Sequence, residues 1–326
     1  MLIVQKFGGS SLADLRRLRR TAGIAAEARR RGNQVVLVVS AAGNSTDELL
    51  SLARRILPHP PRRELDVLMA TGEQRSAALM AMMLESLGCP ARSFSGARAG
   101  IHTDANFGEA AILRVEPQAL RQSLGAGEIA VVAGFQGRSP AGELTTLGRG
   151  GSDTTAVALA AALGAERCEI YTDVDGICTA DPRLIPSARL LREIDSRDML
   201  LLAKAGSQVL HPGSVRLAME KAVPLWLLSS FRAGEGTRVL PLPEERRPRL
   251  AGVTRDEASS TVTLVGRAAD LSLLERLRQE LEHSGIPVRS ARAEEGCVRF
   301  TVAPAQLLPA LELCHMAVVE NEEVKK

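Results

Sequence analysis

The sequence predicts an α/β protein: a three-layer αβα sandwich with a mainly parallel central sheet, followed by a small ferredoxin-like domain. Apolar strand-like runs alternate with longer helical patterns over the first two thirds of the chain. Several of these runs are apolar at nearly every position, which is typical of central strands covered on both faces. Glycine, proline and charged residues then crowd together at 232–250, which indicates a boundary between domains.

The elements of the first domain follow from its residue patterns. Residues 2–6 (LIVQK) predict a buried strand, and an amphipathic helix follows the turn at 8–11 and ends near Gly32. Residues 34–40 (QVVLVVS) predict a second, fully buried strand. The same patterns predict helices at 46–57, 62–87 and 153–163, and strands at 128–134 and 168–173.

The C-terminal part predicts the order βαββαβ, which is that of a ferredoxin-like unit. The expected elements are a strand at 259–266, a helix at 270–283, strands around 286–292 and 296–302, a helix at 304–314 and a last strand at 315–320. We therefore expect a large domain at 1–236, a linker at 237–250 and one small domain at 251–326.

Composition excludes several classes of function. The net charge of +3 is too small to indicate nucleic acid or a membrane surface as partner, and 2% aromatic residues argue against stacking on bases. The five cysteines form no CxxC pair and no metal-ligand spacing, so we expect reduced thiols. No signal peptide is recognisable, and no apolar run approaches the roughly 18 residues of a membrane span. We expect a soluble cytoplasmic protein.

A first polar cluster, Lys6-Phe7-Gly8-Gly9-Ser10, follows the first strand. Glycines let a backbone approach phosphate closely, and a lysine beside them can neutralise charge on a transferred phosphoryl group. Only five of the 41 basic residues are lysines, and Lys6 is the only one before position 204. This bias indicates that position 6 requires a compact ammonium rather than a guanidinium. The sequence is not a Walker A loop, and a plain tight turn is the alternative.

Two further clusters lie at 145–153 and 171–183. In the first, Arg149 pairs with carboxylates and Asp153 with ammonium groups, so together they could hold both ends of an α-amino acid. The alternative is a helix cap at Asp153 and a solvated charge at Arg149. In the second, aspartate, threonine and arginine could surround a nucleotide, and a polar turn is the alternative.

The motifs KFGGSS, VVSAAGNSTDEL, ATGEQ, VAGFQG, TTLGRGGSDTTAVALAAALGA, CEIYTDVDGICTADPR and VLHP occur here in the order found in aspartate kinases. From residue 2 to about 236 the chain thus resembles this branch of the amino acid kinase family. The resemblance implies the amino acid kinase fold and transfer of the γ-phosphoryl group of MgATP to the β-carboxylate of L-aspartate. The product, 4-phospho-L-aspartate, leads towards lysine (through diaminopimelate), threonine and methionine. A different carboxylate acceptor, or a non-catalytic amino-acid sensor, remains an alternative.

The resemblance also implies roles for individual residues. Lys6 would bridge the transferred phosphoryl group and the attacking carboxylate, and Arg149 would clamp the α-carboxylate, with Asp153 and Glu73 near the amino group. The implied nucleotide contacts are Lys6, Phe7, Gly8, Gly9, Ser10, Thr172, Asp173, Cys178, Asp181 and Arg183. The implied substrate contacts are Ser40, Thr46, Glu73, Arg149, Gly150, Gly151, Ser152 and Asp153. No protein ligand is implied for Mg²⁺, which the phosphates would hold.

Three departures from the family pattern stand out. Cys178 and Gln208 occupy positions where many relatives have tyrosine and lysine. The region after 250 has room for one regulatory ACT module where relatives usually carry two, so we expect it to pair across a homodimer or larger homo-oligomer. Its turn at 266–271 lacks the Pro-Gly often found at effector sites, and we expect weak or absent inhibition by lysine or threonine. A purely dimerising role of this region is the alternative.

Overall fold

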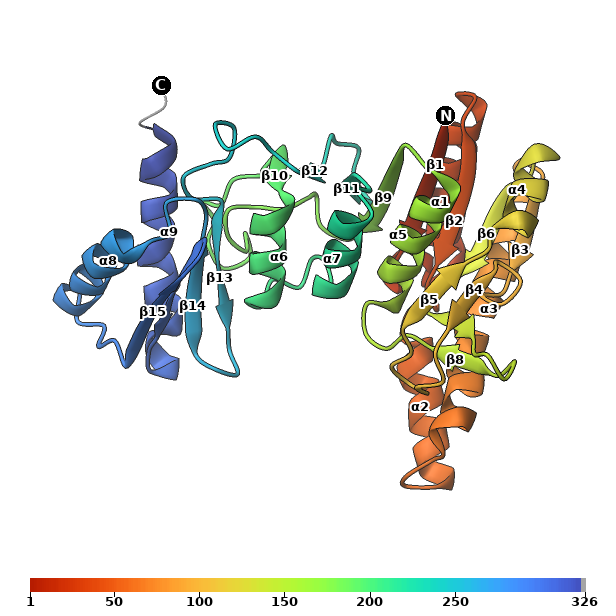
Figure 1. Cartoon of the computed structure of the whole chain (residues 1–326), viewed down its shortest axis with the longest axis horizontal. Helices are drawn as coiled ribbons and strands as arrows, with labels where there is room; N and C mark the ends of the chain where they lie inside the picture. Colours follow the sequence, from red (N-terminus) through yellow and green to blue (C-terminus); the bar gives the residue numbers. More distant parts are fainter. Residues whose placement is uncertain (324–326) are drawn as a thin grey trace. The chain divides into compact units, whose positions relative to one another are not determined.

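The computed structural model describes residues 1–323, which form two compact units (Figure 1). The first unit comprises residues 1–175 and 216–234, and the second comprises 176–215 and the chain from 235 onward. Two segments that precede position 250 thus pack with the C-terminal part of the chain. The domain boundaries expected at 236 and 250 remain a prediction.

A parallel sheet of six strands forms the centre of the first unit, in the order β11-β9-β1-β2-β6-β3. Its strands are β1 (Leu2–Phe7), β2 (Gln34–Val39), β3 (Ala91–Phe94), β6 (Ile129–Ala133), β9 (Arg167–Thr172) and β11 (Leu225–Ser229). The central strands are buried at almost every position, because helices cover both faces. The mainly parallel sheet and the strands expected at 2–6, 34–40, 128–134 and 168–173 are confirmed.

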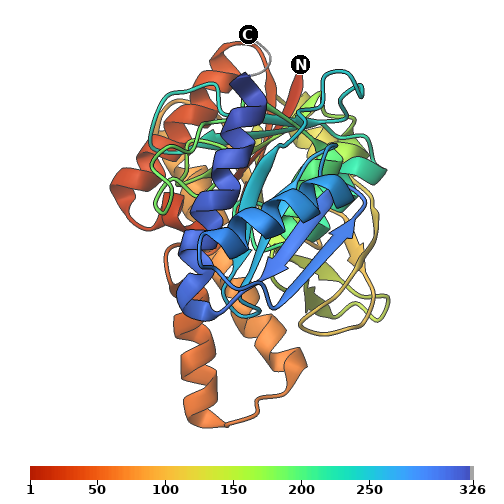
Figure 2. The same cartoon turned by 90° about the vertical axis from the view of Figure 1, so that its left-hand side faces the viewer.

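Helices form the two outer layers of the first unit. On one face, α1 (Leu15–Arg30) and α3 (Arg62–Ser86) pack against apolar side chains of the sheet. On the other face lie α4 (Gln118–Gly125) and α5 (Gly151–Leu163). The helix α2 (Ser45–Ile56) packs on α3, and this pair extends beyond the sheet in Figures 1 and 2. The helices expected at 46–57, 62–87 and 153–163 are confirmed.

A second, smaller sheet in the first unit was not predicted. It has the order β5-β4-β7-β8, and its strands are β4 (Ile101–Thr103), β5 (Ile112–Val115), β7 (Gln136–Arg138) and β8 (Leu144–Thr146). Strands of three or four residues are too short to show a period of two in the sequence. The sheet matters for function because β8 leads into the glycine-rich segment that precedes α5.

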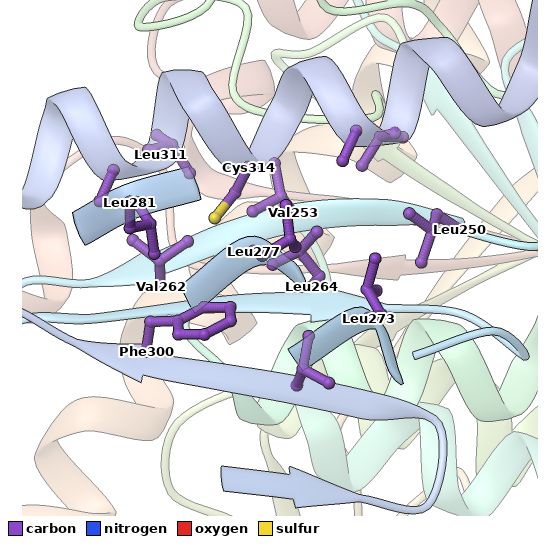
Figure 3. Close-up of a cluster of buried hydrophobic side chains, with 14 of the residues drawn as sticks. Leu250, Val253, Val262, Leu264, Leu273, Leu277, Leu281, Phe300, Leu311 and Cys314 are labelled. Atoms are coloured by element: carbon purple, nitrogen blue, oxygen red, sulfur yellow. The ribbon is translucent and has the colours of Figure 1, made fainter. Parts of the chain in front are cut away.

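The second unit contains an antiparallel sheet of order β13-β14-β16-β15. Its strands are β13 (Gly252–Asp256), β14 (Thr261–Val265), β15 (Ser290–Glu294) and β16 (Cys297–Thr301). The helices α8 (Leu271–His283) and α9 (Leu307–Glu323) lie on one face, and between them and the sheet is an apolar core that includes Leu264, Leu277 and Leu311 (Figures 2 and 3). The rest of the unit consists of β10 (Glu193–Asp195), α6 (Ser196–Lys204), the first residues of α7 (Pro212–Glu220), β12 (Thr237–Leu240) and the short 3₁₀ turn at Pro304–Gln306.

The strand predicted at 315–320 is wrong, because α9 continues without a break through this stretch. The buried apolar residues along α9 follow helical spacing, as on one face of a helix: Leu307, Ala310, Leu311, Cys314, Ala317 and Val318. The edge position beside β14 is taken instead by β13, which lies before it in the chain. The order of elements is therefore ββαββα rather than the predicted βαββαβ.

Among residues 1–323, none of the helices is both long enough and apolar enough to cross a bilayer.

Candidate active site

A cleft of about 720 Å³ opens in the first unit where β1, β2 and β6 end. Open α/β sheets bind ligands at this carboxyl edge, because the loops that follow the strands converge there. Every residue that lines the cleft belongs to the first unit. Most of the predicted substrate and phosphate residues line it: Lys6, Gly9, Ser40, Thr46, Glu73, Arg149, Gly150, Gly151, Ser152 and Asp153.

The glycine turn after β1 lies against the loop after β2. The amide of Gly43 donates a 2.9 Å hydrogen bond to the carbonyl of Gly9, and a Cβ on Gly9 would lie 2.6 Å from the carbonyl oxygen of Ala41. Only glycine permits this approach. A Cβ on Gly8 would lie 3.7 Å from Lys6 Nζ, so the ammonium reaches the glycine turn. The turn is therefore built for close contact between backbone and ligand.

Phe7 and Ser10 differ from the other members of this cluster. The ring of Phe7 is fully buried and stacks on Tyr171 with 4.5 Å between ring centroids, so its side chain belongs to the core. Ser10 is exposed outside the cleft. Phe7 as a whole is 0% exposed and does not line the cleft.

Lys6 forms an ion pair with Asp153, with 2.6 Å between Nζ and Oδ1, and both side chains are 13% exposed. The alternative of a helix cap at Asp153 is wrong, since Gly150 occupies the cap position of α5 without a side-chain hydrogen bond. Asp153 instead fixes the ammonium within the cleft. The pair joins residues that lie far apart in the sequence, and no local pattern could have revealed it.

The segment before α5 needs its glycines. Gly148 and Gly150 both have φ of +72°, in the left-handed region that other residues avoid. A Cβ on Gly151 would lie 2.8 Å from the ring of Phe135, itself a non-glycine residue with φ of +68° that lines the cleft. This strained backbone brings Arg149 into the cleft, where its exposed guanidinium has no ion pair or hydrogen bond within the described part of the chain.

Glu73 lies on α3 at the inner wall of the cleft and is 4% exposed. Its Oε1 accepts a 3.1 Å hydrogen bond from the amide of Ala41, and its Oε2 is buried without a partner among residues 1–323. Burial raises the pKa of the Glu73 carboxyl to about 7. An open, buried carboxylate oxygen in a cleft is a suitable acceptor for the ammonium group of a ligand.

The raised pKa of Glu73 makes a prediction about stability. The carboxyl titrates near 4.3 in an unfolded chain, so between that pH and about 7 the folded protein binds more protons, and its unfolding free energy falls as pH rises. Glu73→Gln removes this penalty, and at pH 8 the variant should be more stable than wild type by up to about 3 kcal/mol, with little difference at pH 4. Urea unfolding at both pH values measures it, with the exposed Glu48→Gln as control. Equal stability of Glu73→Gln and wild type at pH 8 would contradict the raised pKa.

Asp66, also on α3, was missed by sequence reasoning and is 1% exposed. One carboxylate oxygen accepts hydrogen bonds from the amides of Gly108, at 3.0 Å, and Thr146, at 2.8 Å, and the other accepts one from the Thr146 hydroxyl, at 2.8 Å. Asp66 therefore fixes two loops that bring Glu109 and Arg149 to the cleft. In the sequence, Asp66 is an aspartate within a helical pattern, and such a residue is ordinarily expected on the surface.

Replacing Asp66 by asparagine should loosen these two loops. Asparagine can keep its carbonyl oxygen on the two amides only by turning its NH2 group to the Thr146 hydroxyl, and these hydrogen bonds then lose their charged acceptor, so the free energy of unfolding should fall by about 2 kcal/mol. Thermal unfolding measures this loss, and hydrogen exchange should show that the amides of Gly108 and Thr146 lose protection. Asp47→Asn, which alters an exposed aspartate of the same cleft, should leave both measurements unchanged.

The predicted nucleotide loop is divided between the units. Thr172 ends β9 in the first unit and donates a 3.1 Å hydrogen bond to Asp173, and neither residue lines the cleft. The chain enters the second unit at Gly176, so the other members, Cys178, Asp181 and Arg183, belong to that unit. There the Arg183 guanidinium lies 2.7 Å from the Asp181 carboxylate and holds its pKa below the usual range.

Comparison with known proteins identifies the family to which the chain belongs. A model of the amino acid kinase family matches residues 1–229. The aspartokinase of Thermus thermophilus is 47% identical over 287 residues, which cover 88% of this chain and 71% of that protein. The aspartokinase of Bacillus sp. is 44% identical over 328 residues, which cover 99% of this chain and 79% of that protein.

Solved structures give the same result. The crystal structure of aspartate kinase from Synechocystis superposes with a TM-score of 0.67 at 37% identity, covering 96% of this chain and 54% of that one. E. coli aspartokinase III in complex with aspartate and ADP superposes with a TM-score of 0.71 at 27% identity, covering 96% and 84%. The chain therefore belongs to the amino acid kinase family and, within it, to the aspartokinases.

Proposed function

We propose that this chain transfers the γ-phosphoryl group of MgATP to the β-carboxylate of L-aspartate, giving ADP and 4-phospho-L-aspartate. The proposal rests on the geometry of the cleft. There the Lys6 ammonium, paired with Asp153, reaches the glycine turn and faces the same space as Arg149 and Glu73. Relatives that are 44 and 47% identical are named aspartokinases, and a structural neighbour binds aspartate and ADP.

Arg149 and Glu73 are suited to an α-amino acid with both charged ends free. The Arg149 guanidinium can bind the α-carboxylate with two parallel hydrogen bonds, and the open Oε2 of Glu73 can accept one from the ammonium group. Acetylation would remove the positive charge with which the buried Glu73 carboxylate can pair, which disfavours N-acetylated acceptors. Held at these two ends, aspartate can present its β-carboxylate to the transferred phosphoryl group.

Lys6 supplies a positive point charge for the transferred phosphoryl group. The attacking carboxylate is already ionised at neutral pH, so the reaction needs no general base, and positioning and charge neutralisation provide the catalysis. Asp153 holds the ammonium in place, so that little reorganisation is needed when charge develops on the phosphoryl oxygens. The motif that the chain shares with aspartate kinases after β9 supplies the remaining proposed nucleotide contacts: Thr172, Asp173, Cys178, Asp181 and Arg183.

Bound Mg²⁺ would neutralise charge on the phosphates of ATP. Within residues 1–323, no three His, Cys, Asp or Glu side chains gather as a metal site. We propose that the ligands of the ion are mainly phosphate oxygens and water, as is usual for Mg²⁺ in phosphoryl-transfer sites.

The acceptor can be identified by trapping the product. An acyl phosphate reacts with hydroxylamine to give a hydroxamate, whose coloured complex with ferric iron reports transfer to a carboxylate directly. We expect hydroxamate formation with L-aspartate and MgATP, and at least a hundredfold less with N-acetyl-L-aspartate or L-glutamate. Equal or greater formation with either would favour the alternative acceptor, and nucleotide binding without any hydroxamate would favour the sensor.

A further inference from the structure

The loop that contains Cys178, Asp181 and Arg183 is part of the core of the second unit. Ala180 and Ile185, both at most 5% exposed, belong to the same apolar cluster as the core residues of α8 and α9. Leu277 of α8 and Leu311 of α9 are among the members of this cluster that Figure 3 labels. The backbone of this loop is therefore held by the fold that follows residue 250.

Hydrogen bonds join this loop to β13 through Thr179. The amide of Val253 donates to the Thr179 carbonyl at 2.8 Å, and the amide of Thr179 donates to the carbonyl of Arg189 at 2.9 Å. A Cβ on Gly252 would lie 2.9 Å from the same Thr179 carbonyl oxygen, so β13 approaches the loop as closely as a glycine permits. Thr179 is thus the point at which the loop meets the sheet.

A histidine of α9 contacts the same threonine. His315 Nε2 lies 2.9 Å from Thr179 Oγ1, and both residues are 1% exposed. The same hydroxyl oxygen accepts a 3.0 Å hydrogen bond from the amide of Arg189, and His315 Nδ1 lies 3.5 Å from Ser187 Oγ. The imidazole therefore links α9 to Thr179, which lies next to Cys178 and two residues before Asp181, and approaches Ser187, four residues after Arg183.

We propose that His315 is a positioning residue for nucleotide binding: through Thr179 it sets the conformation of residues 178–183. The inference rests on the nucleotide role proposed above for this loop. Loss of either member removes a buried hydrogen bond between α9 and Thr179, and this lets the loop leave its conformation. Nucleotide affinity then depends on how α9 packs in the C-terminal fold.

The test compares His315→Leu and Thr179→Val with wild type, using the full chain. We expect each variant to raise the KM for ATP and the Kd for ADP, measured by calorimetry, about tenfold. The KM for aspartate and kcat should stay within twofold. His315→Gln, whose amide can occupy the place of Nε2, should recover most of the affinity. The double variant should be no worse than either single variant, because both remove the same hydrogen bond.

A matched control separates positioning from general loss of stability. Leu277→Val removes one carbon from the same apolar cluster on α8, and Leu277 is absent from every hydrogen bond of the loop described above. The proposal is overturned if this variant weakens ADP binding as much as His315→Leu does, or if His315→Leu binds ADP like wild type. Wild type that binds ADP without forming hydroxamate would contradict the proposed function alone. Wild type that binds no ADP would overturn both.

Discussion

Replacing Lys6 by alanine is expected to lower kcat for aspartate phosphorylation about a thousandfold, with smaller changes in KM. The Lys6 ammonium is mostly buried and held by Asp153 at 2.6 Å, so it is oriented before the substrates bind. Loss of one preorganised charge aimed at developing negative charge commonly costs this much. Steady-state ADP release measures kcat, and Lys221→Ala, which removes an exposed lysine of the same unit, should behave like wild type.

Lys6→Arg tests the argument about the point charge. It keeps the positive charge, but the planar guanidinium is larger and has its donors in a fixed fork, so it cannot occupy the narrow site beside Gly8 and Asp153 in the same way. We expect it to recover less than a tenth of the wild-type rate. Full activity of Lys6→Arg would contradict this account of the lysine while leaving the assignment of the activity intact.

Replacing Arg149 by glutamine is expected to raise the KM for aspartate between about tenfold and a hundredfold, with little change in the KM for ATP. The exposed Arg149 guanidinium has no intramolecular ion pair in the described chain, so it is available for the α-carboxylate and its removal should disturb little else. Initial rates at varied aspartate and fixed, saturating ATP give this KM.

Arg98→Gln is the matched control for Arg149, since Arg98 is exposed on the same unit and does not line the cleft. It should leave both KM values unchanged. A rise in KM for aspartate below threefold in Arg149→Gln, or an equal rise in KM for ATP, would contradict the proposal that Arg149 binds the α-carboxylate of aspartate.

The sequence predicted those parts of the fold that are determined by the pattern of neighbouring residues. The strand from residue 34 is apolar at nearly every position, and it proved to be a central strand of a parallel sheet. Arg149 and Asp153 were singled out from one polar cluster, and both line the cleft. The excess of arginine over lysine singled out Lys6, which lies in the cleft.

The failures of prediction have non-local causes. The segment 315–320 contains valines that suit a strand, but it continues the helical spacing of the α9 residues that precede it, and packing on the sheet decides the outcome. Asp66 is identifiable only once Gly108 and Thr146 lie beside it. The link between Thr179 and His315 joins residues 136 positions apart, a separation at which no sequence pattern operates.

The central claim is that the cleft phosphorylates aspartate with Lys6 as its essential charge. The most direct test follows ADP release from MgATP as L-aspartate is added, for wild type and for Lys6→Ala. We predict saturable, aspartate-dependent ADP release by wild type and a rate about a thousandfold lower for the variant. ADP release by wild type that does not respond to aspartate, or equal rates in the two proteins, would contradict the account.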